Sequence, residues 1–204
     1  MDTEEKYMSH LQGVVKIPTV SSVNDENTDW SQFDRLHQYM QEAWPLIFEK
    51  LSLTRIGKAS LLFHWKSENP KKEPVLFMAH QDVVPAIHEE QWSHPPFEGE
   101  VDGGCLWGRG AEDCKSVLTA EMDAVEELLE EDFAPDFDIY LSFGHNEEVQ
   151  CTPDKKGSVL TAAYLKEQGI HLACLFDEGG NVEEGREGEP PLALVGMAEK
   201  APNE

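Results

Sequence analysis

The fold is constrained most strongly by three short apolar segments, each of which ends in acidic or histidine residues. The first covers 75–79 and runs directly into His80 and Asp82, the second covers 137–143, and the third covers 169–176. Apolar runs of this length are typical of buried strands. Between them, apolar residues recur at helical spacing over 114–131 and 157–168. Strands that alternate with helices predict an α/β sheet with helices on both faces.

The N-terminal part of the chain adds elements to this sheet. Helical spacing predicts a helix that ends before Pro18 and a second amphipathic helix from about Phe33 to Trp44. Two apolar segments around Gly57-Lys58 predict a β-hairpin over 51–65. A long irregular segment, 85–104, is of a length that usually serves binding, and a last strand is expected at 192–198.

Composition excludes some classes of partner. The formal charge of −24 argues against nucleic acid, because binding phosphates needs a basic surface. The charge is explained either by solubility or by carboxylates that hold cations. No segment has the length of a membrane span, and the acidic N-terminus does not resemble a secretory signal. The four cysteines show no C-x-x-C spacing, so free thiols in a reducing compartment are expected. Together these features predict a cytoplasmic protein that does not bind membranes.

The polar residues at the strand ends predict a metal site. They are His80 with Asp82, Glu147 with Glu148, and Asp177 with Glu178, and Asp113 lies where a short strand meets a helix. Ligands collect at the carboxyl ends of strands in open α/β sheets, so these groups should converge. Clustered carboxylates repel one another unless cations hold them. Mixed histidine and carboxylate ligands favour zinc, with manganese or cobalt as alternatives, and their number suggests two ions sharing a bridging carboxylate.

The spacing of His80 and Asp82 predicts how the first ligand is oriented. Side chains two residues apart on a strand point to the same side, so the two leave the strand end together. A metal-bound imidazole usually donates its other N–H to a carboxylate, which fixes its tautomer and orientation. One further carboxylate must stay free of metal in order to take a proton from water.

These motifs resemble the aminoacylase and carboxypeptidase S type of zinc peptidase. The resemblance rests on collinear strings spread over nearly the whole chain: 78–85 (MAHQDVVP), 92–99 (WSHPPFEG), 108–115 (GRGAEDCK), 145–148 (HNEE) and 177–180 (DEGG). Two of them are most similar to carboxypeptidase S and the N-acyl-amino-acid hydrolases. The resemblance implies a zinc-exopeptidase-like catalytic domain that hydrolyses an amide next to a free carboxylate, in a dipeptide or an N-acyl amino acid.

The resemblance also implies a role for each residue. Asp82 would orient His80, and Glu147 would be the general base. Asp113 would bridge two zinc ions, and its peptide bond to Cys114 is often cis in such enzymes. The metal ligands are thus expected to be His80, Asp113, Glu148 and Asp177.

The chain departs from the family pattern at its end. In such enzymes the second zinc takes a histidine far downstream, after a lid and dimerisation domain, and no histidine follows His171. We therefore expect 1–204 to be the N-terminal portion of a catalytic domain, incomplete at the C-terminus, and do not expect it to oligomerise. The alternative function is a folded, non-catalytic fragment that binds at most one metal ion.

Each assignment has a simpler alternative. Asp113 could be a helix N-cap, the Glu147-Glu148 pair could be a solvated strand end, and Glu178 could replace Asp177 as the ligand. Cys114 could bind metal, but a packed thiol is expected. The glutamates of the 114–131 helix are expected on its solvated face: Glu121, Glu126, Glu127 and Glu130.

Overall fold

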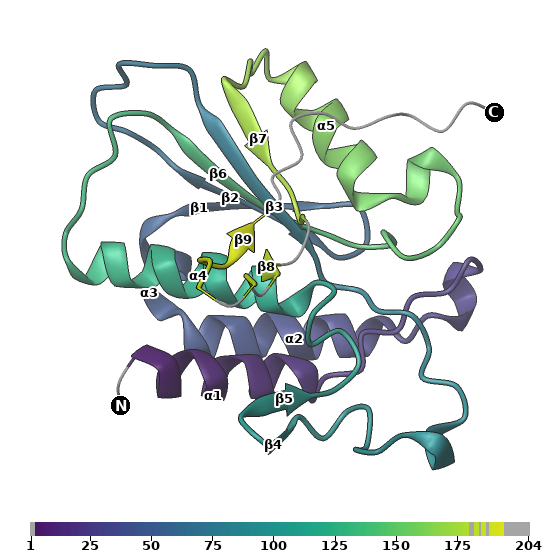
Figure 1. Cartoon of the computed structure of the whole chain (residues 1–204). Coiled ribbons are helices and arrows are strands. Elements are labelled where there is room, and N and C mark those ends of the chain that lie inside the picture. Colours follow the sequence, from purple (N-terminus) through teal and green to yellow (C-terminus); the bar gives the residue numbers. More distant parts are fainter. Residues whose placement is uncertain (1–2, 180–181, 184, 187, 194–204) are drawn as a thin grey trace.

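The centre of the protein is a five-stranded sheet with the strand order β1-β2-β6-β3-β7 (Figure 1). The structure is a computed structural model that describes residues 3–179, 182–183, 185–186 and 188–193. The sheet is built from β1 (Ser52–Ile56), β2 (Ser60–Trp65), β3 (Val75–His80), β6 (Ile139–Gly144) and β7 (Cys174–Phe176). Two small two-stranded sheets lie outside it: β4 (Glu100–Asp102) with β5 (Cys105–Trp107), and β8 (Val182–Glu183) with β9 (Leu192–Ala193).

Strand direction brings the carboxyl ends of β3, β6 and β7 to one edge of the sheet. Strand β3 lies between β6 and β7 and is parallel to both, whereas β1 and β2 form an antiparallel hairpin. In this register His80 at the end of β3 lies next to Gly144 at the end of β6. The loops that follow β3 and β6 therefore begin next to each other at this edge of the sheet.

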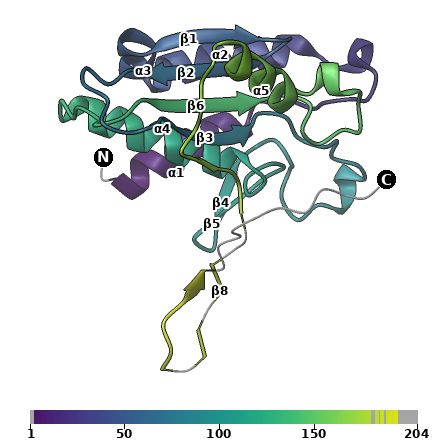
Figure 2. The same cartoon turned by 90° about the horizontal axis from the view of Figure 1, so that it is seen from above.

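Helices cover both faces of the sheet, which confirms the predicted fold class (Figures 1 and 2). One face carries α1 (Thr3–Val15), α2 (Trp30–Ala43), α3 (Pro45–Lys50) and α4 (Lys115–Glu130), and the other carries α5 (Gly157–Glu167). Within the described residues, no helix has both the length and the apolarity needed to span a membrane.

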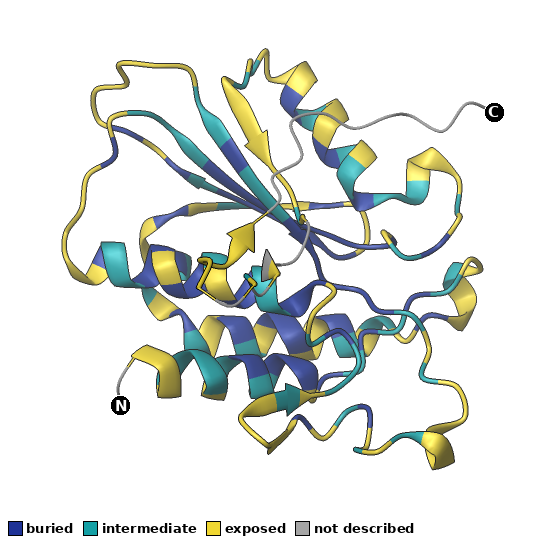
Figure 3. Ribbon diagram, in the orientation of Figure 1, coloured by how far each residue is buried: buried dark blue, intermediate teal, exposed yellow. Residues whose placement is uncertain are grey.

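The inner strands of the sheet are largely buried (Figure 3), because successive residues of a strand pack on opposite faces and helices cover both. On β2, Leu61 and Phe63 pack with the larger helical layer, while Leu62 between them packs with α5 on the opposite face. On β3, Ala79 and Leu76 divide between the two faces in the same way. The edge strand β7 is exposed over its whole length.

Most predicted elements have the expected positions, including the hairpin and the helices near 114–131 and 157–168. The helix expected to reach Trp44 ends at Ala43, because Pro45 cannot continue it and instead begins α3. The strand expected over 169–176 shrinks to Cys174–Phe176, since Gly169 has a left-handed φ of +69° and closes the end of α5. The strand expected at 192–198 is described only at Leu192–Ala193, and 194–198 lie outside the described residues.

The prediction that the glutamates of α4 are all solvated is wrong for Glu126, which is only 3% exposed. Its carboxylate accepts hydrogen bonds from the main-chain N–H groups of Leu46 (2.9 Å) and Ile47 (3.0 Å). These groups lie at the N-terminus of α3, where no side chain of the helix itself caps them. Glu126 therefore serves as a tertiary cap, and negative charge is favourable at a helix N-terminus.

Glu126→Ala is expected to lower the free energy of unfolding by roughly 2–3 kcal/mol, because it leaves one buried and one half-buried N–H group without a charged acceptor. Urea unfolding followed by circular dichroism measures the change. Glu130→Ala is the matched control on the same helix, because Glu130 is exposed; it should change the stability by less than about 0.5 kcal/mol. Equal effects of the two substitutions would show that Glu126 does not cap α3.

Candidate metal centre

The polar clusters predicted from the sequence meet at the carboxyl edge of the sheet. His80 is the last residue of β3, Glu147 and Glu148 follow β6, and Glu178 follows β7. Asp113 comes from the turn before α4, which packs against β3. Four residues from three separate segments of the chain offer ligand atoms that all lie within 4.8 Å of one another: His80, Asp113, Cys114 and Glu178.

One nitrogen of His80 faces a ring of carboxylates. Its Nε2 lies 2.8 Å from Asp113 Oδ1, 3.4 Å from Glu178 Oε2 and 4.0 Å from Glu147 Oε2. The His80 side chain is 4% exposed, whereas the Asp113 side chain is 66% exposed. The site is therefore closed on the side of the sheet and open toward Asp113.

The other nitrogen of His80 is fixed by Asp82, but through the main chain. Nδ1 lies 2.9 Å from the Asp82 carbonyl oxygen and 3.8 Å from its carboxylate Oδ1. A carbonyl can only accept, so Nδ1 carries the proton and Nε2 is free to bind a cation. The Asp82 carboxylate is completely buried and accepts instead from the N–H groups of Glu147 and Glu148.

The peptide bond between Asp113 and Cys114 is cis, as the resemblance implies. Cys114 is 1% exposed, and its Sγ accepts a hydrogen bond from the main-chain N–H of His80 at 3.0 Å. Burial raises the pKa of the Cys114 thiol to about 11, although His80 opposes the shift. The expected packed thiol is thus present, and it lies directly against the histidine.

The electrostatics of the centre favour positive charge. Burial by itself lowers the pKa of His80, but hydrogen bonds with Cys114 and Glu178 outweigh it and raise the pKa to about 12. The same contact with His80 lowers the pKa of Glu178. In the protein alone, the imidazolium ring is therefore the cation that neutralises the surrounding carboxylates.

The pKa values of Glu147 and Glu148 are both raised. Burial is the first cause for both, with additional repulsion of Glu147 by Glu178 and of Glu148 by Asp113. Glu147 Oε2 lies 4.0 Å from His80 Nε2, and neither glutamate is among the four grouped ligands in the described part of the chain. A carboxylate with a raised pKa is suited to accept and release a proton near neutral pH.

Of the two acids after β7, Glu178 is the one that contacts His80. The Asp177 carboxylate accepts from the N–H of Glu178 at 2.9 Å and lies near Glu121 of α4. Burial and the charge of Asp177 raise the pKa of Glu121 to about 8, so Glu121 is also not on the solvated face where it was expected. Glu178 therefore belongs to the group of ligand atoms around His80. Metal binding by Asp177 stays a prediction.

The donor set fits a divalent metal ion. An imidazole nitrogen and carboxylate oxygens are the ligands of catalytic zinc sites, and manganese or cobalt accept similar sets. The residues that fit are His80, Asp113 and Glu178, because their ligand atoms are grouped and their combined charge calls for a cation. The neutral Nε2 that the Asp82 carbonyl leaves available is the form that binds metal.

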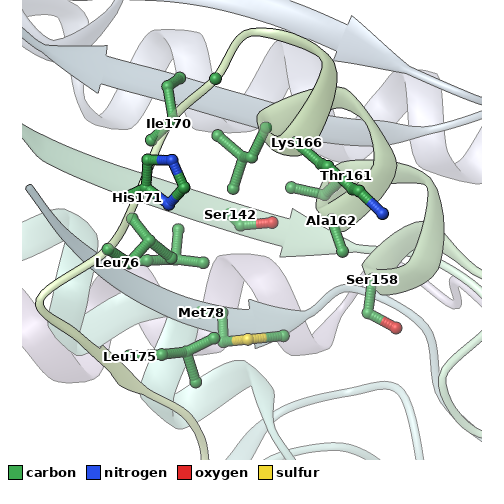
Figure 4. A pocket seen from close by; sticks show the side chains of 13 residues that line it. Leu76, Met78, Ser142, Ser158, Thr161, Ala162, Lys166, Ile170, His171 and Leu175 are labelled. Carbon is green, nitrogen blue, oxygen red and sulfur yellow. The ribbon is translucent and has the colours of Figure 1, made fainter.

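Two cavities lie along β3. A small one of about 110 Å³ lies at the metal centre and is lined by His80, Glu147 and Glu178 among others. A larger one of about 460 Å³ lies between α5 and the sheet, with mainly apolar walls (Figure 4). The two share Met78 and Ser158, but the larger one includes none of the acidic residues of the centre. We therefore locate the chemistry in the smaller cavity.

One contributing residue was missed in the sequence. Ser21 donates to the buried Asp82 carboxylate at 2.7 Å, yet it lies in a polar loop with no periodicity or motif to single it out. Lys115 is 0% exposed and donates from Nζ to the carbonyl oxygens of Val14 (3.0 Å) and Ile17 (2.7 Å), tying the end of α1 to the turn that carries Asp113. Burial lowers the pKa of Lys115 to about 7.

Curated proteins of similar sequence match most of this chain. The chain is 37% identical over 189 residues to carboxypeptidase S of Saccharomyces cerevisiae, which covers 85% of this chain and 32% of the relative. It is 36% identical over 194 residues to the N-fatty-acyl-amino acid synthase/hydrolase PM20D1 of Mus musculus, covering 93% of this chain and 38% of the relative. The chain thus spans about a third of the length of the curated relatives it matches.

Solved structures share the fold. An M20 family metallo-carboxypeptidase from Sulfolobus solfataricus matches with a TM-score of 0.65 at 21% identity, over 90% of this chain and 38% of that one. The di-peptidase Dug1p from Saccharomyces cerevisiae also gives 0.65, at 19% identity, over 88% and 39%. Residues 76–191, more than half of the chain, match the description "Peptidase family M20/M25/M40". The chain therefore belongs to peptidase family M20/M25/M40, whose relatives include carboxypeptidase S and PM20D1.

Proposed function

We propose that the protein is a metal-dependent hydrolase that cleaves an amide next to a free carboxylate, in a dipeptide or an N-acyl amino acid. The observation that carries the proposal is the placement of His80 Nε2 among Asp113, Glu178 and Glu147, with Nδ1 held by a carbonyl. This arrangement combines metal ligands with one carboxylate left over for proton transfer.

The proposed metal ligands are His80, Asp113, Glu148 and an acid of the Asp177-Glu178 pair. The sequence predicts Asp177 for this last position, and the 3.4 Å contact with His80 supports Glu178. Zinc suits the mixed donor set, and a bridging role for Asp113 fits its open, exposed carboxylate. Two ions would use Asp113 in common, with Glu148 serving the second.

Glu147 is the proposed general base. A divalent ion bound here would supply Lewis acidity and lower the pKa of a water molecule. Glu147 would take the proton from the attacking water and then donate it to the leaving nitrogen of the amide. Its raised pKa, caused by burial and by the charges of Glu178 and Asp82, favours this exchange of a proton near neutral pH.

The substrate class is supported by the named activities of the relatives. One is a carboxypeptidase, and another is described as an N-fatty-acyl-amino acid synthase/hydrolase. Both names describe substrates in which an amide nitrogen belongs to an amino acid with a free carboxylate. We infer the same substrate class for this chain.

Removal of metal tests the proposal. Treatment with a chelator is expected to abolish hydrolysis of N-acyl amino acids and dipeptides, and added zinc should restore it. Elemental analysis should show bound metal before the treatment and none after it. Hydrolysis that continues in metal-free protein would overturn the proposed mechanism, because the bare imidazolium and carboxylates offer no activated water.

A second candidate is a folded protein that binds one metal ion without turnover. It is favoured by the finding that one group of ligand atoms, around His80, is preformed in the described part of the chain. Metal stoichiometry separates the two candidates. One bound ion and no turnover would support the second candidate, whereas two tightly bound ions with turnover would support the hydrolase.

A further inference from the structure

The Asp82 carboxylate holds the main chain of the two glutamates. It is 0% exposed and accepts from Glu147 N–H at 3.1 Å on Oδ1 and from Glu148 N–H at 3.2 Å on Oδ2. Asn146, just before them, has a left-handed φ of +58°, which turns successive N–H groups toward one side. Such turns form a concave binding site for an anion, and here the anion is a side chain of the same protein.

Ser21 is the remaining donor to this carboxylate. Its hydroxyl donates to Asp82 Oδ2 at 2.7 Å, and the serine itself is 2% exposed. A buried carboxylate needs its hydrogen bonds, because an unsatisfied charge in the interior is costly. The hydroxyl therefore fixes the oxygen that also binds the Glu148 N–H.

The main chain around Ser21 is bonded to the end of β3. The Thr19 hydroxyl donates to the Gln81 carbonyl at 2.5 Å, and Val83 N–H donates to the Thr19 carbonyl at 3.0 Å. Ser21 N–H donates to the Val83 carbonyl at 3.2 Å. The segment 19–21 thus runs beside 81–83 as a short parallel bridge, so the Ser21 side chain has little freedom to move.

Asp82 forms hydrogen bonds both with His80 and with the main chain of the two glutamates. Its carbonyl accepts from His80 Nδ1, while its carboxylate holds the N–H groups of Glu147 and Glu148. A shift of the Asp82 side chain would move the glutamates relative to His80. Distances in a catalytic site must be held within a fraction of an ångström, so even a small shift of the Asp82 side chain would disturb the site.

We propose that Ser21 is a positioning residue for Glu147 and Glu148. Its hydroxyl locks the Asp82 carboxylate, which holds the peptide N–H groups of Glu147 and Glu148 and so sets both side chains relative to His80. The roles of these glutamates as base and ligand rest on the proposed function. The hydrogen bonds themselves do not, and they can be measured separately.

The test compares Ser21→Ala with Ser22→Ala, its neighbour. Ser22 bonds Thr28 through its main-chain N–H, which alanine keeps. In metal-free protein, Ser21→Ala should speed amide hydrogen exchange at Glu147 and Glu148 by roughly ten- to a hundredfold. The reason is that the Asp82 carboxylate, which accepts from both N–H groups, loses its hydrogen bond from Ser21. Ser22→Ala should leave it unchanged. Ser21→Thr, which keeps the hydroxyl, should restore much of the protection.

A second readout is kinetic. Ser21→Ala should lower kcat for an N-acyl amino acid by about tenfold and change KM by less than about twofold, as expected for a misplaced base. Unchanged amide exchange in a folded Ser21→Ala protein would overturn the inference, and so would faster exchange with unchanged kcat and zinc affinity. If exchange increases but the wild-type protein neither binds zinc nor hydrolyses substrate, the proposed function is wrong and the Ser21–Asp82 contact is supported.

Discussion

Glu147→Gln is expected to lower kcat for hydrolysis of an N-acyl amino acid by about 10²–10⁴-fold. Glutamine keeps the size of the side chain but cannot accept a proton from water. The substitution leaves the Glu147 main-chain N–H, and hence its bond to Asp82, in place. Zinc stoichiometry should remain that of the wild type, because Glu147 is proposed to act on the water molecule and not as a metal ligand.

Glu148→Gln is the matched control, since Glu148 is the next residue and is bonded to the same carboxylate. It should weaken binding of the second metal ion, which Glu147→Gln should not do. Kinetics together with elemental analysis of both variants separate the roles of base and ligand. A Glu147→Gln protein that keeps nearly full activity would show that the base is another group.

Asp113→Asn is expected to weaken zinc binding by more than about 100-fold. This exceeds the 10–100-fold typical for a residue that acts only through a ligand, because Asp113 is proposed to contact both ions directly. The amide is neutral and supplies one acceptor oxygen, so charge and bridging capacity are lost together. Stability should change little in the metal-free protein, because the Asp113 side chain is 66% exposed.

Isothermal titration with zinc measures the Asp113 effect. Glu112→Gln is the control, since Glu112 is the adjacent exposed acid. It should leave zinc affinity within about twofold of the wild type, because an exposed charge outside the site is screened by solvent. If the two substitutions weaken binding equally, the loss reflects general negative charge and Asp113 is not a ligand.

The strand ends were predictable because their signal is local. An apolar run that stops at His80 is readable from residue types alone, and the parallel arrangement follows from the helices between the strands. The fold class and the family resemblance therefore follow from the sequence alone. The family and the α/β arrangement are confirmed by the comparisons.

The burial of two acids could not be predicted. Glu126, which is buried, and Glu121, which is half-buried, lie on α4 among other glutamates of the same type, and only the neighbouring segments determine which of them are covered. The choice between Asp177 and Glu178 likewise depends on the direction of the chain after β7. Periodicity describes one helix at a time and does not report what packs against it.

The sequence by itself determined the fold class, the family and the set of acids and histidine at the carboxyl ends of the strands, because each depends on residue type and spacing. Only the tertiary structure decided which atoms of these residues form hydrogen bonds with one another. The Asp82 carbonyl, rather than its carboxylate, orients His80, and that carboxylate is committed to Glu147, Glu148 and Ser21. Hydrogen bonds between segments more than 60 residues apart depend on distances that no local pattern encodes.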